Sequence, residues 1–477
     1  MRRMTDLGRD RVLISSDFGD YALLSRDEAD ALQAGGQGLS PTRRMDLAAR
    51  GLTNVSGAVP DLDEAVRRTR KAFLLEGPTL HIFVVTLRCD HSCHYCQVSR
   101  AAVGAAGFDM SLADADAALD RVFEAPGRDL TIEFQGGEPA LRFDLVRHIV
   151  LGAKSRNADG AKALRFTMVS TLHHLGEADL AFCAEHEIQL STSIDGASAL
   201  HDHQRPNPSR DAWARTVEGI GRARAALGEH AVAALPTVTR AALNDPHGLV
   251  DTYRALGLRS IFLRPVSPYG FARKTARVHG YSTAEFLAFY AQALDYILKL
   301  SAAGEAIEEV YAAILLRHIW SPFHSGYVDL RSPAGAGLGV MVYNYDGLAY
   351  PSDEARMAAE TGDKRFALGR VDQPLDDLLA SPAMSWLAAG AVAEAIPSCD
   401  RCAFLPYCGA DPVHHAVVHG DPVGDRAASD FCERQTGLFR ILFEHIDKGD
   451  PETLRTFTAW AFRKDRREVR TSGFVER

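Results

Sequence analysis

The sequence predicts an α/β protein whose parallel β-sheet closes into a partial (β/α)6 barrel, with a small N-terminal α+β module and a cysteine-rich C-terminal domain. Three observations lead to this fold. Between residues 81 and 266, six apolar β-type runs alternate with helical segments, which is typical of parallel strands joined by crossovers. The first 78 residues carry hairpin and helix signals. After about residue 325, Gly, Pro and Asp become frequent, and four of the eight cysteines occur there. A complete barrel or an open doubly wound sheet would give the same alternation.

The length supports several domains, because at about 150 residues per domain 477 residues correspond to about three. We expect an N-terminal module, a barrel, a cysteine-rich domain and a C-terminal helix with a tail. Their predicted ranges are 1–78, 79–322, 323–440 and 441–477.

The N-terminal module is predicted to begin with a β-hairpin formed by residues 12–15 and 21–24 around the polar sequence SDFGD. Ser25 is a suitable N-cap for the helix that follows it. Helical patterns return at 41–50 and 62–73.

The barrel segment contains the alternating elements. The predicted strands are 81–87, 130–135, 164–171, 188–194, 231–239 and 260–266. The predicted helices between them include 112–123, 143–154, 211–227 and 248–256, and longer helices follow at 283–302 and 306–319. In the C-terminal part we expect a hairpin of 339–343 and 347–350, and a tail from residue 454 that begins helical and ends frayed.

Charge and hydropathy exclude several classes of protein. The net charge is −9 with a pI near 6.1, which argues against a non-specific nucleic-acid binder and disfavours an RNA-modifying enzyme. The N-terminus lacks the apolar core of a signal peptide, and no apolar run approaches the length of a membrane span. We therefore expect a cytoplasmic protein whose clustered cysteines bind metal rather than form disulfides.

The first cysteine cluster follows the first predicted barrel strand directly. Cys89, Cys93 and Cys96 form a C-x3-C-x2-C pattern at the end where α/β barrels build active sites. Three thiolates leave one position open in a tetrahedral zinc site or in a 4Fe–4S cluster. The pattern therefore predicts either a zinc loop completed by His91 or His94, or a cluster with one iron available for a ligand.

Polar and glycine residues also follow the next strands. The second strand ends in Gly136-Gly137-Glu138-Pro139, where two glycines would let a ligand approach closely. The third ends at Ser170, and the fourth runs into Ser193-x-Asp195 and then Arg205. Each alone is typical of a turn, a cap or a surface ion pair. Their placement at successive strand ends favours a shared ligand site.

The cysteine triplet, with an aromatic residue before its last cysteine, resembles the radical S-adenosylmethionine (SAM) superfamily. The resemblance implies a 4Fe–4S cluster on Cys89, Cys93 and Cys96 whose fourth iron chelates SAM. Reductive cleavage of SAM would then give methionine and a 5′-deoxyadenosyl radical that abstracts hydrogen. Tyr95 would approach adenine through its backbone. The implied SAM-binding residues are Tyr95, Gly136, Gly137, Glu138, Ser170, Ser193, Asp195 and Arg205.

The second cysteine cluster consists of Cys399, Cys402, Cys408 and Cys432. Four thiolates fit structural zinc or an iron–sulfur cluster equally well. The C-x2-C-x5-C spacing resembles the SPASM extension of radical SAM peptide maturases, which implies one auxiliary 4Fe–4S cluster. Serines stand where the extension has its first cysteines, at Ser332 and Ser352, so the resemblance implies that a further auxiliary cluster is absent.

Asp353 follows Ser352 directly. By resemblance it is a candidate general base on the substrate, and a hydrogen-bonded turn residue is the alternative.

Three strings narrow the resemblance to the His-Xaa-Ser system radical SAM maturase of the B type. They are LRCDHSCHYCQVSR at 87–100, SPAGAG at 332–337 and YPSDEARM at 350–357. This implies a ribosomal precursor peptide with His-Xaa-Ser repeats, modified for example by a cross-link, and a second radical SAM maturase subunit. A reductase such as flavodoxin or ferredoxin would supply electrons. The N-terminal module resembles peptide-recognition domains that bind a leader peptide by strand addition, or else caps the barrel. The rival functions are a sulfatase-maturase-like protein oxidase and a zinc-stapled binding or regulatory protein.

Overall fold

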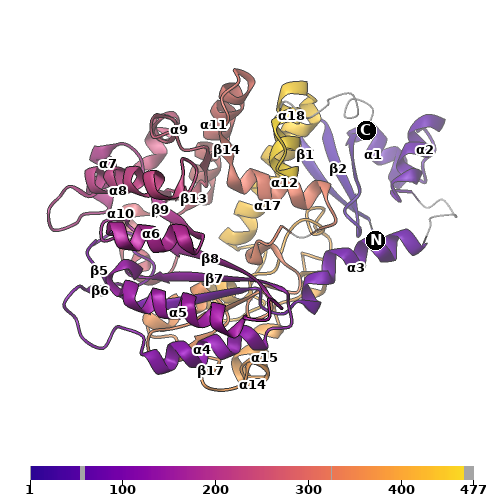
Figure 1. Cartoon of the computed structure of the whole chain (residues 1–477). Helices are drawn as coiled ribbons and strands as arrows, with labels where there is room; N and C mark the ends of the chain where they lie inside the picture. Colours follow the sequence, from indigo (N-terminus) through magenta and orange to yellow (C-terminus); the bar gives the residue numbers. More distant parts are fainter. Residues whose placement is uncertain (1, 54–59, 324, 467–477) are drawn as a thin grey trace. The chain divides into compact units, whose positions relative to one another are not determined.

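The computed structural model describes residues 2–53, 60–323 and 325–466 (Figure 1). The chain forms two compact units, each assembled from separated stretches. The sheet unit comprises Leu74–Val310 and Ala336–Leu387, and the terminal unit comprises Met1–Phe73, Tyr311–Gly335 and Ala388–Arg477. The predicted frayed end of the tail lies outside the described residues. The four predicted domain boundaries stay predictions.

The sheet unit is built on an eight-stranded sheet with the order β10-β9-β8-β7-β4-β15-β16-β17. Strands β4, β7, β8, β9 and β10 pair in parallel, each beside the previous one in the chain, and β15 pairs in parallel with the other edge of β4. This confirms the predicted α/β class. The bounds are β4 Leu80–Thr86, β7 Asp129–Gly136, β8 Ala163–Val169, β9 Ile188–Ser193, β10 Val232–Leu235, β15 Val340–Tyr343, β16 Leu348–Tyr350 and β17 Gly369–Arg370.

Burial explains why these segments form strands and helices. Residues 81–86 of β4 are all buried, as expected of a parallel strand covered on both faces. Helix α5 buries Leu145, Val146, Ile149 and Val150, the spacing of one apolar helical face. Helix α4 packs on α5, and α6 packs on α8 and β9. The helices of this unit are α4 Leu112–Glu124, α5 Phe143–Arg156, α6 Glu177–Glu185, α7 Ser198–Gln204, α8 Ala212–Leu227, α9 Pro246–Ala255, α10 Gly270–His279, α11 Thr283–Ala302, α13 Asp353–Glu360, α14 Leu375–Leu379 and α15 Pro382–Ala388.

The fifth and sixth predicted strands are broken. The run at 231–239 divides into β10 and β11 (Thr237–Val238) around Pro236, which lacks an N–H for a ladder bond. The run at 260–266 divides into β12 (Ser260–Ile261) and β13 (Arg264–Pro265), which pair in parallel with β14 (Glu308–Glu309) and β11 respectively. Pairing of β14 also explains why helix α12 (Val310–Trp320) begins later than the predicted residue 306.

The terminal unit begins with a three-stranded antiparallel sheet of β1 (Arg2–Gly8), β2 (Arg11–Ser16) and β3 (Tyr21–Ser25). The predicted hairpin is confirmed, and Ser25 caps helix α1 through a full capping box with Glu28. Strand β1 was not predicted because its sequence, RRMTDLG, lacks a regular apolar alternation. The other helices of this unit are α1 Arg26–Gln33, α2 Pro41–Ala49, α3 Pro60–Lys71, α16 Pro412–His419, α17 Asp430–Lys448 and α18 Pro451–Phe462.

The predicted hairpin at 339–350 is confirmed as β15 and β16, and it extends the main sheet. Among the described residues, no helix combines the length and apolar character required to cross a membrane.

A buried polar pair joins β4 to β15. His81 is fully buried, and its Nδ1 lies 3.0 Å from the hydroxyl of Tyr343. Burial lowers the pKa of His81 from 6.5 to about 3, so the folded state keeps the ring neutral. The wild-type chain should therefore lose stability as the pH falls from about 6.5 towards 3, because the unfolded histidine binds a proton that the folded one does not.

We predict that Tyr343→Phe lowers the free energy of unfolding by about 1–3 kcal/mol, because it leaves a buried ring nitrogen without its partner. Urea denaturation at pH 7 measures the loss. The difference from wild type should be equal at pH 7 and pH 8, where His81 is neutral in both chains. An unchanged urea midpoint would contradict this role for the pair.

Candidate functional site

The first cysteine loop leaves the sheet unit at the carboxyl end of β4. Arg88–Cys89 forms β5, which pairs in parallel with β6 (Ala101–Ala102) and so closes the base of the loop. Within the loop, the Cys96 amide donates to the Cys93 carbonyl at 3.2 Å. The Ser92 amide donates to the Pro206 carbonyl at 2.7 Å and the His94 amide to the Gln204 carbonyl at 3.0 Å. These bonds fix the loop against the end of α7.

The three thiols of this loop are free. Burial raises the pKa of Cys89 well above its ordinary value and that of Cys93 to about 12. Neutral thiols are poor nucleophiles, so the raised pKa values do not favour Cys89 or Cys93 as a thiolate nucleophile. A metal or cluster that replaces the protons fits this set of donors.

Gly136 and Gly137 pack against the backbone that enters this loop. Gly136 has φ +140°, and a Cβ there would lie 1.9 Å from the carbonyl oxygen of Thr86. A Cβ on Gly137 would lie 2.4 Å from the carbonyl oxygens of Leu87 and Arg88. From the sequence, we expected both glycines to let a ligand approach closely. In the structure they allow the end of β7 to approach the end of β4.

Glu138 connects the ends of β7 and β8. Its side chain is fully buried and accepts hydrogen bonds from the Ser170 hydroxyl at 2.6 Å, the Thr171 amide at 2.6 Å and the Ala140 amide at 2.9 Å. Its own amide donates to the Arg88 carbonyl at 2.8 Å. One carboxylate thus joins the third strand end to the entrance of the cysteine loop.

Tyr95, Asp195 and Arg205 form a second buried network. The Tyr95 hydroxyl donates to Asp195 Oδ2 and accepts from Arg205 Nη1 at 2.7 Å, while Asp195 Oδ1 accepts from the Thr237 amide at 3.1 Å. Burial raises the pKa of Asp195, although Arg205 acts in the opposite direction. Burial disfavours the Arg205 cation, but nearby Cys93, Tyr95 and Asp195 outweigh it and raise its pKa. A fixed positive charge therefore lies close to a cysteine of the triplet.

Ser193 ends β9, opposite Leu235 in the neighbouring strand. The structure thus brings the residues predicted from successive strand ends to one edge of the sheet, since carboxyl ends of parallel strands meet there. The hydrogen bonds that join them run from Glu138 to Ser170, from Glu138 to Arg88, and among Tyr95, Asp195 and Arg205.

Sequence reasoning missed an acidic–histidine cluster beside Cys89. Asp90 Oδ1 lies 3.0 Å from His91 Nδ1, and Asp90 Oδ2 lies 3.0 Å from His174 Nε2 and 3.4 Å from His173 Nδ1. Burial opposes ionisation of Asp90, but these histidines outweigh it and hold its pKa well below the usual range. Ligand atoms of Cys89, Asp90 and His91 lie within 4.8 Å of one another, which keeps a mixed-ligand metal site as an alternative. The adjacent residues His173 and His174, shortly after Ser170, were the sequence signal that could have indicated this cluster.

Asp353 is the first residue of α13, which Ser352 caps. Both Nε and Nη2 of Arg356 donate to Asp353 Oδ1 at 3.0 Å, and the Arg356 side chain is fully buried. This ion pair is the arrangement expected for the structural alternative. The role of Asp353 as a base stays a prediction.

Glu133, on β7, is a titratable residue that the sequence argument did not select. It accepts hydrogen bonds from Gln135 and, at 3.2 Å, from Thr167. Burial raises its pKa, and the charge of Asp353 adds to the effect.

The second cysteine cluster lies in the terminal unit. The Cys402 amide donates to the Cys399 carbonyl at 3.0 Å, and the Cys408 amide to the Phe404 carbonyl at 3.1 Å. Cys432 is in the first turn of α17, after the N-cap Ser429. Aromatic packing brings this loop to α17, because the ring of Phe404 lies 5.6 Å from that of Phe439 and 6.1 Å from that of Phe443.

All four thiols of this cluster are free. Burial is the main cause of the raised pKa of Cys408, and the charges of the other three cysteines add to it, so the four thiols lie near one another. Arg426 is 5% exposed, and its buried Nε has no hydrogen-bond partner among the described residues. The charges of Cys399, Cys408 and Cys432 act on this cation, which burial disfavours. An unsatisfied donor beside four thiols fits a sulfur-rich acceptor such as an iron–sulfur cluster.

Comparison with known proteins gives a family match over the part of the chain that contains the first cysteine loop. Residues 83–244 match the Radical SAM superfamily and form a radical SAM domain. A 4Fe–4S cluster and SAM are the cofactors of this superfamily, and the C-x3-C-x2-C triplet lies within the matched residues. A search of curated proteins finds no match to the sequence.

Several solved structures resemble the fold of this chain at low sequence identity. "Native anSMEcpe with bound AdoMet" has a TM-score of 0.65 at 14% identity, over 80% of this chain and 98% of that one. "Native anSMEcpe with bound AdoMet and Cp18Cys peptide" has a TM-score of 0.65 at 15% identity, over 80% and 99%. Streptococcus suis SuiB bound to precursor peptide SuiA has a TM-score of 0.52 at 14% identity, over 89% and 98%.

Glu133 on β7 and Glu138, which follows β7 directly, give a matched test of this edge of the sheet. We predict that Glu138→Gln lowers the free energy of unfolding by about 1–3 kcal/mol, because the amide presents a donor where the carboxylate accepts three hydrogen bonds. Glu133→Gln should cost clearly less, because burial already favours the neutral acid at that position. Urea denaturation of both variants measures the difference. Equal losses would contradict the linking role of Glu138.

Proposed function

We propose that this protein is a radical SAM enzyme that cleaves SAM reductively and uses the resulting 5′-deoxyadenosyl radical to modify a ribosomally synthesised peptide. The observation that carries the proposal is the assembly at one sheet edge. The cysteine loop follows β4, Glu138 connects β7 to β8, and Arg205 lies beside Cys93 at the end of α7. SAM carries an amino group and a carboxylate, and this edge places an acidic and a basic side chain near the cysteine loop that would hold the cluster.

Within this proposal the residues have distinct tasks. Cys89, Cys93 and Cys96 hold the 4Fe–4S cluster, which when bound supplies the electron for SAM cleavage. Backbone groups at Gly136 and Gly137 and the polar groups of the next strand ends orient SAM. A guanidinium such as that of Arg205 suits a carboxylate. The assigned SAM-contact residues are Tyr95, Gly136, Gly137, Glu138, Ser170, Ser193, Asp195 and Arg205.

The second cysteine cluster is proposed to hold one auxiliary 4Fe–4S cluster through Cys399, Cys402, Cys408 and Cys432. The unsatisfied Nε of Arg426 fits a sulfur acceptor at this site. The C-x2-C-x5-C spacing, which resembles the SPASM extension, is what supports an iron–sulfur cluster over structural zinc. Such a cluster would accept or relay electrons during product formation.

The peptide substrate is supported by the fold likeness to structures solved with peptides bound. Within the proposal, a precursor with His-Xaa-Ser repeats, a second maturase subunit and a flavodoxin- or ferredoxin-type reductase are the partners. Two arginine side chains already bond to the edge of β3, where a leader peptide would bind by strand addition. Arg43 Nη2 donates to the Leu23 carbonyl at 2.7 Å and Arg50 Nη1 to the Tyr21 carbonyl at 3.1 Å. A peptide added at this edge must displace both arginines.

Anaerobic reconstitution with iron and sulfide tests the proposed chemistry. We predict about eight irons per chain and 5′-deoxyadenosine formation from SAM after dithionite reduction. Cys93→Ala should abolish 5′-deoxyadenosine formation and retain about four irons, since the second cysteine cluster is intact. Cys183→Ala is the matched control, because this buried cysteine belongs to neither cluster.

Two results would contradict the proposal. Stoichiometric zinc without iron would favour the binding protein, and wild-type rates of SAM cleavage in Cys93→Ala would exclude the assigned triplet. About four irons with active SAM cleavage would keep the radical site and would mean that the second cysteine cluster holds zinc or a labile iron–sulfur cluster.

A further inference from the structure

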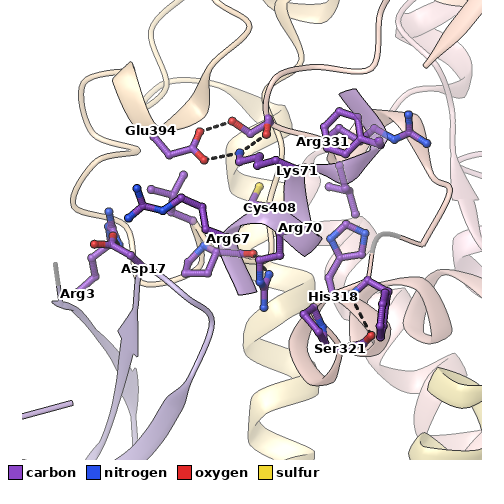
Figure 2. A pocket seen from close by; sticks show the side chains of 17 residues that line it. Arg3, Asp17, Arg67, Arg70, Lys71, His318, Ser321, Arg331, Glu394 and Cys408 are labelled. Carbon is purple, nitrogen blue, oxygen red and sulfur yellow. Dashed lines mark hydrogen bonds and ion pairs between the residues drawn. The ribbon is translucent and has the colours of Figure 1, made fainter. Parts of the chain in front are cut away.

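A cavity of about 350 Å³ lies within the terminal unit, and none of the residues assigned to SAM lines it (Figure 2). Its walls come from β1, α3, the 318–332 segment and the 394–408 segment. Five cationic side chains line it, against two carboxylates. A local excess of positive charge is unexpected in a chain whose net charge is −9.

Three of the cations come from one face of α3. Arg67, Arg70 and Lys71 are spaced three and four residues apart, so their side chains leave the helix on the same side. Figure 2 shows them extending from the helix toward the cavity. Like charges at this spacing repel one another by a few tenths of a kcal/mol per pair. A ligand of opposite charge would relieve that repulsion.

Both carboxylates of the cavity are already engaged. Asp17 pairs with Arg3 at 2.6 Å, and Glu394 pairs with Lys71 at 2.6 Å while also accepting from the Ser332 hydroxyl. Burial opposes ionisation of Glu394, but the hydrogen bonds from Lys71 and Ser332 outweigh it and lower its pKa. Arg67 and Arg70 therefore have no carboxylate partner within 4 Å among the described residues.

Arg70 is the cation whose environment most needs an anion. Its Nη1 donates to the Pro406 carbonyl at 2.7 Å, while its Nε is buried without a hydrogen-bond partner in the described part of the chain. Burial lowers the pKa of Arg70, although Tyr407 and Asp20 act in the opposite direction. Arg67 lies over the ring of Phe18 at 5.6 Å and is exposed.

The remaining wall is apolar and includes Phe323, which is 61% exposed, with Leu330, Leu405 and Pro406. Its volume is at the lower end of ligand pockets and suits a few side chains rather than a folded protein. Cations from separate segments combined with apolar surface fit a peptide that carries carboxylates between apolar residues. An inorganic anion would leave the apolar wall uncovered.

We propose that this cavity binds a carboxylate of an extended peptide segment, with Arg67 and Arg70 as its charge partners. The inference rests on the proposed peptide-modifying function and names a substrate feature, an acidic group flanked by apolar residues. Cys408 lines the same cavity. A peptide anchored there would lie beside the predicted auxiliary cluster.

Fluorescence polarisation on the reconstituted, full-length chain tests the site. The probe is a short fluorescein-labelled peptide of alternating leucine and glutamate with an amidated C-terminus. Two control peptides replace every glutamate by glutamine; one has an amidated C-terminus and the other a free C-terminus. Comparing them distinguishes binding of a side-chain carboxylate from binding of the terminal carboxylate. We predict binding of a carboxylate-bearing peptide that weakens with added salt. Arg67→Gln with Arg70→Gln should weaken it about tenfold or more.

Arg44→Gln is the control for net charge, because Arg44 is exposed on α2 and does not line the cavity. It should change the affinity less than about twofold. Circular dichroism shows whether the Arg70→Gln variant folds. If it does not fold, Arg67→Gln alone tests the site.

Four results would overturn the inference: no binding of any probe, equal binding of the fully amidated glutamine peptide, no effect of the Arg67 and Arg70 substitutions, or full competition by inorganic phosphate. The proposed function is judged separately by 5′-deoxyadenosine formation in the wild-type chain. SAM cleavage without acidic-peptide binding would reject this cavity alone.

Discussion

The close approach of two backbone segments organises the candidate radical SAM site. Gly136 and Gly137 let the end of β7 contact the carbonyls of residues 86–88, the last residues before Cys89. The Glu138 amide then bonds to Arg88, and its carboxylate reaches Ser170. Any side chain at the two glycines would separate these strand ends. The position of the cysteine loop relative to the second and third strands therefore depends on this contact.

Local signals made much of the fold and the site predictable. The alternation of β-type runs and helices predicted the parallel sheet, and Ser25 with Glu28 predicted the start of α1. Cysteine spacing predicted that the thiols gather in two places, because cysteines a few residues apart in the sequence stay close in the fold. Their roles as cluster ligands stay predictions. The strand-end residues were also predictable, since parallel strands place their carboxyl ends together.

Features that depend on distant partners were not predictable. The ion pair of Asp353 with Arg356 favours a structural role that the motif alone could not distinguish from a catalytic one. The histidines around Asp90 come together only when β8 lies near the cysteine loop. Strand β1 depends on pairing with β2 rather than on its own polar sequence. The basic cavity likewise gathers residues from segments more than 300 positions apart.

The most direct test of this account is an anaerobic crystal structure of the reconstituted chain with SAM. The account predicts a 4Fe–4S cluster bonded to Cys89, Cys93 and Cys96, with SAM on the fourth iron and its polar groups within hydrogen-bond distance of the ends of β7, β8 and β9. A single metal ion held by Cys89, Asp90 and His91, with SAM absent from this edge, would contradict it.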